Sequence, residues 1–584
     1  MAALSLVPLA LVAWAWSLTL ARALPRADFV FNNGTEVSSL DPAAANGIPE
    51  GRVIRALYEG LYTREPIGGN AVPALAANTE LSADRLTYIF KLKPGIVWSN
   101  GDPLTAADFE WNFRRLLDPE TASPFAGELW CIRGARELNT GRDAADTPVE
   151  PGAVALGVKA TDDATLVIEL VAPTAHFLEL LAAYQLSPVH RASLEAARKR
   201  SPQGWTSEWT RPGALVGNGP YVLAERRLND RIRLVKNERY WDADSVAMRT
   251  IDALAIEDAT TAFNLYFAGE VDWLDGNVPA SLIDRLLARD DFDPEPYFGL
   301  YFYRVNTTKP PLDDPRVRRA LYATINRVQI CDRLLEAGQK PAYTLVPWGH
   351  MGSYSSPPAK KEDLEGARQA LAEAGFGPEG KPIGTLRILY NSSEQNRSIA
   401  ELVANDWSEY LDIDVDLENQ EWKSYVDRQS NLQYDVSRSS WICDYLDVLN
   451  FFAVFTSESD NNRTGWKNAD YDKLIAEARG IVDPGARNAL LRRAETILLD
   501  ELPILPIYSY VSQNLVDPRV GGFGVNPLNE QNPKYWYWMD EPELARSRRA
   551  QNKREKKVSS HGPKEGLYSP KAQAERKAGG RTRK

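Results

Sequence analysis

The sequence predicts an α/β protein built from more than one domain. A chain of 584 residues is longer than one hydrophobic core normally organises, so two or three domains are expected. Apolar residues make up 44% of the chain and charged residues 25%, which is the composition of an ordinary globular protein. In the second half, residues 385–390 and 412–418 have strand patterns, and an amphipathic helical pattern at 397–411 lies between them. This strand, helix, strand order is typical of an α/β sheet.

The other elements follow from hydrophobic periodicity, taken in chain order. A short strand is expected from Phe29, followed by turn-forming residues up to Pro42. Further expected elements are a strand at 85–93, a helix at 105–117, an alternating strand segment at 160–170, a turn-rich stretch at 213–222 before another strand, and amphipathic helices at 471–478 and 488–499. No repeat of solenoid length appears in the sequence.

Charge is distributed unevenly along the chain. The net charge is −11, but residues 543–584 contain 14 Lys/Arg and 4 Asp/Glu, so this end carries +10 and residues 1–542 carry −21. An acidic body of this kind is not expected to bind nucleic acid. The segment 546–584 has no apolar period and is rich in basic residues, Gly, Pro and Ser, so we expect a disordered basic tail.

The amino-terminal segment predicts export. An apolar run from Leu4 to Leu20 is followed by Ala21-Arg22-Ala23, an A-x-A cleavage pattern, so residues 1–23 are expected to be a signal peptide. An uncleaved membrane anchor is the alternative, although the run is short for a bilayer span. The three cysteines, Cys131, Cys331 and Cys443, lie far from residue 24, so neither a lipid-modified terminus nor a disulfide framework is expected.

One carboxylate attracts attention in the segment 437–445, Ser-Arg-Ser-Ser-Trp-Ile-Cys-Asp-Tyr. Asp444 lies within an apolar and aromatic run, six residues after Arg438. It can cap a turn or helix that begins at Tyr445, because Asp accepts hydrogen bonds from backbone N–H groups. It can also anchor a cation supplied by a ligand, because a low-dielectric site strengthens a charge pair.

Signatures of catalysis and of cofactor binding are missing from the sequence. The four histidines, His176, His190, His350 and His561, are widely spaced, and no Cys/His cluster has metal-ligand spacing. The segment Gly375–Lys381 imitates a phosphate-binding loop, but Pro382 replaces the expected Ser/Thr and a helical pattern precedes it. We therefore expect a helix C-cap and turn there, no cofactor and no enzyme activity.

A series of short motifs resembles the oligopeptide- and dipeptide-binding proteins of ABC importers, within the bacterial extracellular solute-binding proteins of family 5. The similar segments span about residues 28–540, and their common order is more specific than any single motif. They are 32–34, 39–42, 92–93, 98–101, 105–109, 156–160, 162–163, 218–219, 240–241, 269–272, Asn306 with 309–311, 316–321 and 420–423.

The resemblance implies a periplasmic-binding-protein fold of two α/β lobes joined by two hinge strands, with an additional β-rich domain. Lobe I would contain residues 24–58, 186–297 and 513–545. The extra domain would be 59–185 and lobe II 298–512. The basic tail would follow from residue 546.

The resemblance also implies a site that binds peptides as an added strand. Asp444 would receive the α-ammonium group of the ligand. The backbones of Ser440-Trp441-Ile442 on one lobe and of Asn46-Gly47-Ile48 on the other would pair with the peptide. Arg438 would face the carboxylate of short peptides, with an internal salt bridge as the alternative, and Trp422 and Trp441 would line side-chain pockets unless they are core residues.

Weaker correspondences and departures concern side-chain preference. Arg428, Tyr297 and Phe302 correspond less clearly to binding positions of the family. Phe125 and Phe302 stand where relatives have tyrosines, and Asn46 replaces an acid. Asn396 replaces a histidine that some relatives use for longer peptides, with Arg397 beside it as a substitute. The half-cystines of some relatives fall on Gly299 and Ile442, so that disulfide is absent.

The resemblance therefore implies a monomeric periplasmic receptor that binds short peptides and delivers them to the permease and ATPase of an ABC importer. Another cargo in the same fold, such as a murein peptide, a nickel chelate or an opine, stays open. A secreted hydrolase is a further alternative, but it requires paired catalytic groups that the sequence does not contain.

Overall fold

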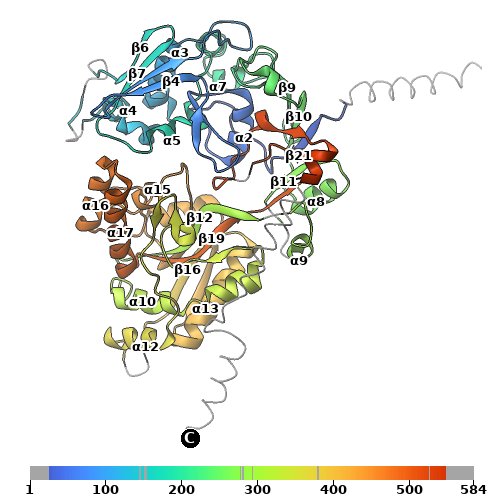
Figure 1. Cartoon of the computed structure of the whole chain (residues 1–584). Helices are drawn as coiled ribbons and strands as arrows, with labels where there is room; N and C mark the ends of the chain where they lie inside the picture. The colour runs from blue at the N-terminus through green and yellow to red at the C-terminus, as the bar shows by residue number, and fades with distance from the viewer. Residues whose placement is uncertain are drawn as a thin grey trace, which may run out of the picture.

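The computed structural model describes residues 25–546 except 144–146, 150–153, 277, 279–281, 293, 378–379 and 525. The expected signal peptide and, apart from Arg546, the expected basic tail lie outside these residues. Within the described part, no helix is long and apolar enough to cross a membrane. The described chain forms two lobes of sheet and helices and a third, β-rich domain. In Figure 1 the first lobe and the β-rich domain lie in the upper half of the view and the second lobe in the lower half, with a pair of crossing strands between them.

Lobe I is built on a six-stranded sheet in the order β20-β11-β1-β10-β9-β8. Strand β1 (Phe29–Asn32) pairs in parallel with β10 (Thr250–Leu254) and β11 (Trp273–Asp275). The other strands are β8 (Tyr221–Arg227), β9 (Arg231–Lys236) and β20 (Asn514–Val516), and the helices are α2 (Ile48–Leu57), α6 (Arg191–Arg200), α7 (Trp205–Glu208), α8 (Ala259–Phe267) and α9 (Ile283–Leu286). Phe31 stacks on Trp273 at 5.2 Å between ring centroids, so aromatic packing ties the central strands together.

Lobe II is built on a second six-stranded sheet in the order β13-β19-β12-β18-β16-β17. Its strands are β12 (Glu295–Val305), β13 (Lys340–Pro341), β16 (Leu386–Asn391), β17 (Val415–Gln420), β18 (Val436–Ile442) and β19 (Ile504–Ser512). Successive residues of β12 point to opposite faces: Leu300 and Phe302 join one hydrophobic cluster, and Tyr301 and Tyr303 join another. Both faces of this sheet are therefore covered.

Helices cover both faces of this sheet. The Tyr301 face packs on α10 (Pro315–Thr324), α12 (Leu364–Glu373) and α13 (Glu394–Leu411), and the Phe302 face packs on α15 (Leu449–Ala453), α16 (Ala469–Gly480) and α17 (Pro484–Glu501). The remaining elements of this lobe are α11 (Arg327–Gln329), a π-helical turn at Ile330–Leu335, α14 (Trp422–Ser430), β14 (His350–Met351) and β15 (Tyr354–Ser355). The helix α13 ends where Asp412 takes the left-handed conformation, at φ 57°.

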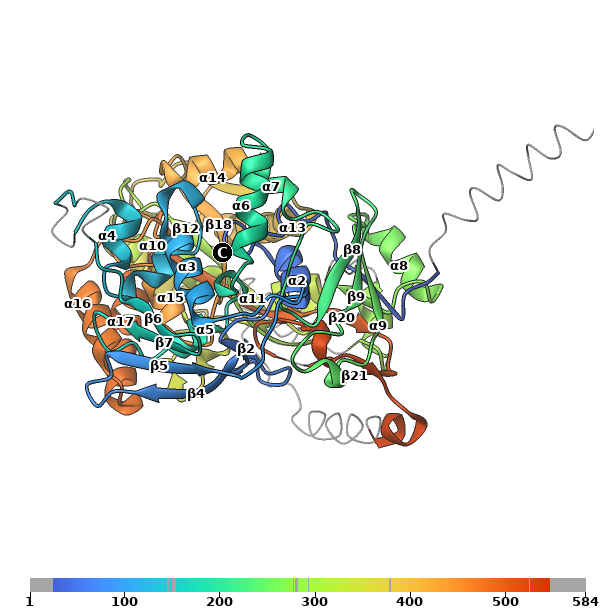
Figure 2. The same cartoon turned by 90° about the horizontal axis from the view of Figure 1, so that it is seen from above.

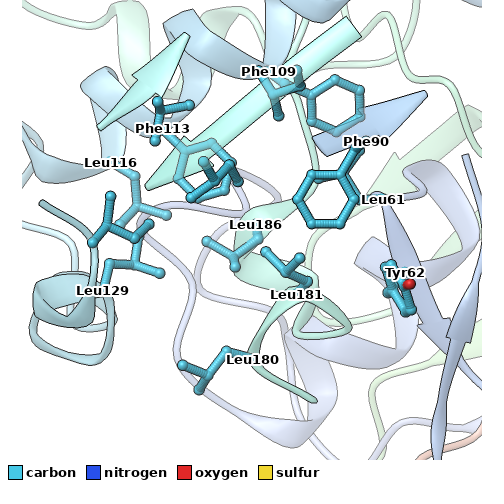
Figure 3. Packing of buried hydrophobic residues seen from close by; sticks show 14 of the residues in the cluster. Leu61, Tyr62, Phe90, Phe109, Phe113, Leu116, Leu129, Leu180, Leu181 and Leu186 are labelled. Carbon is cyan, nitrogen blue, oxygen red and sulfur yellow. The ribbon is translucent and has the colours of Figure 1, made fainter. Parts of the chain in front are cut away.

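The third domain contains a four-stranded antiparallel sheet in the order β4-β5-β7-β6. Its elements are β2 (Tyr62–Arg64), β3 (Ala71–Pro73), β4 (Ala76–Leu81), β5 (Thr87–Leu92), α3 (Ala106–Leu117), α4 (Ala135–Thr140), β6 (Val158–Asp162), β7 (Thr165–Glu169) and α5 (Phe177–Leu181). Phe90, Phe109 and Leu181 are among the residues of its core in Figure 3. We call it the extra domain. Figure 2 shows it on the side of α16 and α17, away from β8 and β9.

Two neighbouring strand segments connect the lobes. Strand β12 begins at Glu295, opposite Ser512 of β19, and the chain then continues into β20 of lobe I. An isolated bridge between Phe292 and Leu515 extends the same antiparallel pair into lobe I. The expected fold of two α/β lobes joined by two crossing strands is therefore confirmed, whereas the exact domain boundaries stay predictions.

The alternating segment at 160–170 forms a hairpin and not one strand. Strand β6 ends at Asp162 and β7 begins at Thr165, because the Asp162 carboxylate accepts the Ala164 N–H at 2.9 Å and closes a tight turn. The expected alternating segment therefore covers two antiparallel strands, the edge strand β6 and the inner strand β7, which also pairs with β5.

Candidate functional site

Strand β18 has one partly unpaired edge. It pairs with β12 from Val436 to Ile442, but with β16 only at Val436 and Ser437. The Arg438 carbonyl accepts hydrogen bonds from the Tyr425 hydroxyl and from Gln429 Nε2, the latter at 2.8 Å. Beyond this point, no strand in the described part of the chain pairs with the second edge of residues 440–442. This edge can accept a further strand, because unpaired N–H and C=O groups template strand addition.

Asp444 lies directly after this edge. The Cys443 N–H donates to the Phe298 carbonyl at 2.8 Å and ends the pairing with β12. Asn450, a buried residue of α15, then organises the turn: its Nδ2 donates to Asp444 Oδ2 at 3.2 Å, and its Oδ1 accepts from Trp441 Nε1 at 2.7 Å. The Asp444 carboxylate and the Trp441 ring are thus fixed by one amide.

No cation of the described residues forms an ion pair with Asp444. Its side chain is exposed at the end of β18 but has protein on several sides, and this partial loss of water raises the pKa of Asp444. The Asn450 donor lowers that pKa, and the nearby negative charge of Glu530 from lobe I raises it. A ligand cation at this position would relieve an unfavourable charge.

Arg438 is surrounded by aromatic side chains at the other end of the partly unpaired edge of β18. Its guanidinium stands over the Tyr301 ring at 4.8 Å, and Nη2 donates to the Tyr510 hydroxyl at 3.1 Å. A longer bond of 3.4 Å joins Nη1 to Asn391 Oδ1. The buried Nε has no hydrogen-bond partner among the described residues, and Arg438 forms no ion pair with a carboxylate there, so the internal salt bridge considered above is not formed.

Asn396 belongs to the same group of polar residues. Its Oδ1 accepts from the Tyr301 hydroxyl at 3.2 Å, and its Nδ2 donates to Asn391 Oδ1 at 3.1 Å. Because Asn391 also contacts Arg438, these residues form one connected network. The Tyr297 ring lies against Tyr510 at the side of this network, with the two ring centroids 6.4 Å apart and the planes inclined at 69°.

On lobe I, the segment 46–48 leads into helix α2. Gly47 is its N-cap, and its N–H donates to the Tyr184 hydroxyl at 3.1 Å. A Cβ at this glycine would lie 2.5 Å from Glu50 Oε2, so a larger residue would displace the carboxylate that receives the Ser38 N–H at 2.8 Å. Asn46 is exposed and Ile48 is 45% exposed, so this segment stays accessible.

The other expected site residues lie outside these groups. Phe302 is fully buried against Phe455 in the lobe II core, and Phe125 is 8% exposed in the extra-domain core. Arg397 pairs with Glu401 at 2.8 Å on the surface of α13, and Arg428 pairs with Glu418 at 2.6 Å. Trp422 begins α14, is 59% exposed and lies 5.5 Å from the Tyr425 ring. Phe302 lies opposite Ser439 of β18, but its side chain packs in the lobe II core. As peptide-binding residues, these five stay predictions.

Comparison with known proteins decides the family. The model of the bacterial extracellular solute-binding proteins, family 5, middle region, matches residues 70–463. The chain belongs to this family. It is 37% identical to the periplasmic murein peptide-binding protein MppA of Escherichia coli over 84% of this chain and 89% of that protein. It is 35% identical to the periplasmic oligopeptide-binding protein OppA of Salmonella typhimurium over 87% of this chain and 92% of that protein.

Solved structures of family 5 proteins share the fold. The Escherichia coli MppA structure gives a TM-score of 0.75 at 34% identity and covers 89% of this chain and 99% of that one. The Haemophilus influenzae OppA complex with the peptide RPPGFSPFR gives 0.73 at 32% identity, covering 89% of this chain and all of that one. These relatives are solute-binding proteins.

Three residues of this candidate site were not singled out from the sequence. Asn450 holds Asp444, Tyr510 holds Arg438, and Glu128 of the extra domain lies near Asp444. A polar residue inside the apolar segment 448–455 was a usable signal for Asn450, because buried amides need partners. Nothing local marks Tyr510 or Glu128, since both reach the site through tertiary structure.

Proposed function

We propose that this family 5 protein captures short peptides as an extended strand between its two lobes and delivers them to the permease and ATPase of an ABC importer. The observation that supports this proposal most directly is the unpaired edge of residues 440–442. It ends at the Asp444 carboxylate, which has no cationic partner among the described residues. Main-chain pairing recognises what all peptides share, and Asp444 recognises the free amino end.

In this proposal the peptide runs from Asp444 toward Arg438. Arg438 has no carboxylate partner among the described residues, and its guanidinium suits the carboxylate of a short ligand, because a guanidinium binds planar anions in a forked geometry. Asn46, Gly47 and Ile48 supply backbone groups from lobe I. Closure of the lobes about β12 and β19 then buries the ligand, and the closed state binds it more tightly.

The proposed location is the periplasm. It rests on the apolar run of residues 4–20 with its A-x-A pattern and on the family to which the chain belongs. The absence of a cysteine near residue 24 supports a protein without a lipid anchor, and we propose that it acts as a monomer without enzyme activity.

A different cargo is the second candidate. The relative MppA binds murein peptide, and another relative with 33% identity is a probable deoxycholate-binding periplasmic protein of Escherichia coli. Murein peptide would use the same main-chain pairing, whereas a bile acid has no ammonium group for Asp444.

Native mass spectrometry of the protein as purified separates these candidates. We expect a ladder of bound masses that corresponds to short peptides of mixed sequence. One repeated mass would indicate a dedicated cargo and contradict a general peptide receptor. Calorimetric titration with a tripeptide, which should bind, and with deoxycholate, which should not, checks the same conclusion in solution.

A further inference from the structure

The turn that carries Asp444 lies against the extra domain at one defined place. Tyr445, the next residue, is 4% exposed and packs in the same hydrophobic cluster as Phe125, Ala126 and Leu129 of the extra domain. The last two belong to a 3₁₀ helix over Ala126–Cys131. Glu128 lies between these two residues and is exposed, and its carboxylate is close enough to the turn of lobe II to interact with the charge of Asp444.

Glu128 has no charge partner of its own. No hydrogen bond or ion pair of its carboxylate occurs among the described residues, whereas Glu530, the other nearby acid, pairs with Arg55 and with Arg64. The loss of water, reinforced by the negative charge of Asp444, raises the pKa of Glu128 to about 7, and only Arg479 of α16 opposes this. Two carboxylates without bound cations thus stand near each other at the end of the β18 edge.

We propose that Glu128 is a specificity-determining residue, which selects peptides whose first residue has a positively charged side chain. The inference rests on the proposed function, because it takes Asp444 as the site of the α-ammonium group. The side chain of residue 1 shares its Cα with that ammonium group and is therefore the side chain nearest to Asp444. A lysine, arginine or ornithine at position 1 would bring two positive charges to two unpartnered carboxylates.

Matched peptides isolate the contribution of the second positive charge, the one on the side chain of residue 1. Lys-Ala-Ala and norleucine-Ala-Ala have side chains of nearly the same length and differ in the ammonium group, and Ala-Lys-Ala moves the charge to position 2. Calorimetry at pH 7.5, where Glu128 with a pKa of about 7 is mostly ionised, should give Lys-Ala-Ala a dissociation constant about tenfold lower than that of norleucine-Ala-Ala on the wild type, as for one partly exposed charge pair.

The variant Glu128→Gln should remove this preference and leave the affinity for norleucine-Ala-Ala unchanged. Affinity for Ala-Lys-Ala should change little. Glu120→Gln is the matched control, because Glu120 is an exposed acid of the same domain that faces Arg198 at 3.2 Å and does not contact the β18 turn. It should preserve the tenfold preference.

The outcomes distinguish this inference from the proposed function. If the peptides bind and the ratio between the lysine and norleucine peptides is the same in the wild type and in Glu128→Gln, Glu128 does not select the first residue. If the wild type binds none of the three peptides, the proposed function fails and this inference fails with it.

Discussion

The Tyr445 ring stacks on the His176 imidazole, with ring centroids 4.8 Å apart and 7° between the planes. Tyr445 belongs to lobe II and follows Asp444, whereas His176 precedes helix α5 of the extra domain. Because Tyr445 is also a member of the extra-domain core, the turn with the proposed amino-terminal anchor is held from two domains. Movement of the extra domain against lobe II would therefore disturb the anchor directly.

This contact should make stability depend on pH. Burial lowers the pKa of His176 from 6.5 to about 4; Asp447 opposes this shift, and Arg487 and Arg479 add to it. Between these values the unfolded chain takes up a proton and the folded protein does not. The contribution of His176 to the free energy of unfolding is thus complete above about pH 6.5 and is lost as the pH falls toward about 4. The loss amounts to at most about 3 kcal/mol.

Urea unfolding of the wild type and of His176→Gln across this pH range measures the effect. Glu128 and Asp406, each with a pKa raised to about 7 chiefly by burial, also titrate in this range but do so in both proteins. The difference between the two stability curves therefore isolates His176. We expect the wild type to lose its advantage as the pH falls, and parallel curves would contradict the assignment.

Gly299 should be sensitive to the addition of one methyl group. It lies opposite Ile442 across β12 and β18, and a Cβ there would meet Ile442 Cδ1 and would lie 2.9 Å from Tyr510 Cδ2. Gly299→Ala should therefore lower the free energy of unfolding by about 1–3 kcal/mol through overpacking. Because Tyr510 contacts Arg438, peptide affinity should fall as well.

A second substitution tests that explanation. Ile442→Val removes Cδ1, so the double variant should recover part of the stability lost in Gly299→Ala. Urea unfolding of the two single variants and of the double variant gives the coupling energy. Strictly additive losses would mean that the two side chains do not compete for this space.

Local sequence signals predicted the regular elements well. The helical pattern at 105–117 forms α3, and Thr105 caps it together with Asp108, whose carboxylate accepts the Thr105 N–H at 2.8 Å. Gly375 has φ 88° directly after α12, as expected for a helix end and not for a phosphate-binding loop. These features depend on neighbours within a few residues, so hydrophobic periodicity and the residue types of turns are enough to predict them.

Long-range placement was not predictable from the sequence. Tyr445 was expected beside the ligand anchor of lobe II, but nothing in its segment indicates that it fills the core of another domain. His176 was one of four isolated histidines, and its partner lies 269 residues away. Phe302 corresponded to a binding position by resemblance, yet the two-residue period of β12 turns it into the core beside Phe455. Such contacts are decided by how the domains meet.

Asn450 should support both the fold and the site. Replacing this buried amide by alanine leaves Trp441 Nε1 and Asp444 without their partner, which should lower the free energy of unfolding by about 1–3 kcal/mol. Peptide affinity should fall too, because the carboxylate is no longer oriented. Urea unfolding and calorimetry measure the two effects. Asn431→Ala, on the exposed end of α14, is the control and should change neither by a comparable amount.

Asp444 should carry the charge that binds the ligand amino group. Asp444→Asn keeps the shape of the side chain and removes its charge, so a peptide with a free amino end should lose about 2–5 kcal/mol of binding free energy, as for a broken charge pair. N-acetylation of the peptide removes the other partner and should cost the wild type a similar amount. The two changes together should cost little more than either one, because they remove the same interaction.

Calorimetry on the four combinations of protein and peptide therefore separates an anchor from a structural residue. If Asp444 only organises the turn through Asn450, its replacement should weaken free and acetylated peptides alike, and the two losses should add. Urea unfolding of Asp444→Asn provides the control for folding. An exposed carboxylate whose pKa is raised by loss of water is not a strong contributor to stability, so the variant should remain folded. An acetylated peptide that binds the wild type as tightly as the free peptide would refute the anchor, since the ammonium group would then contribute nothing.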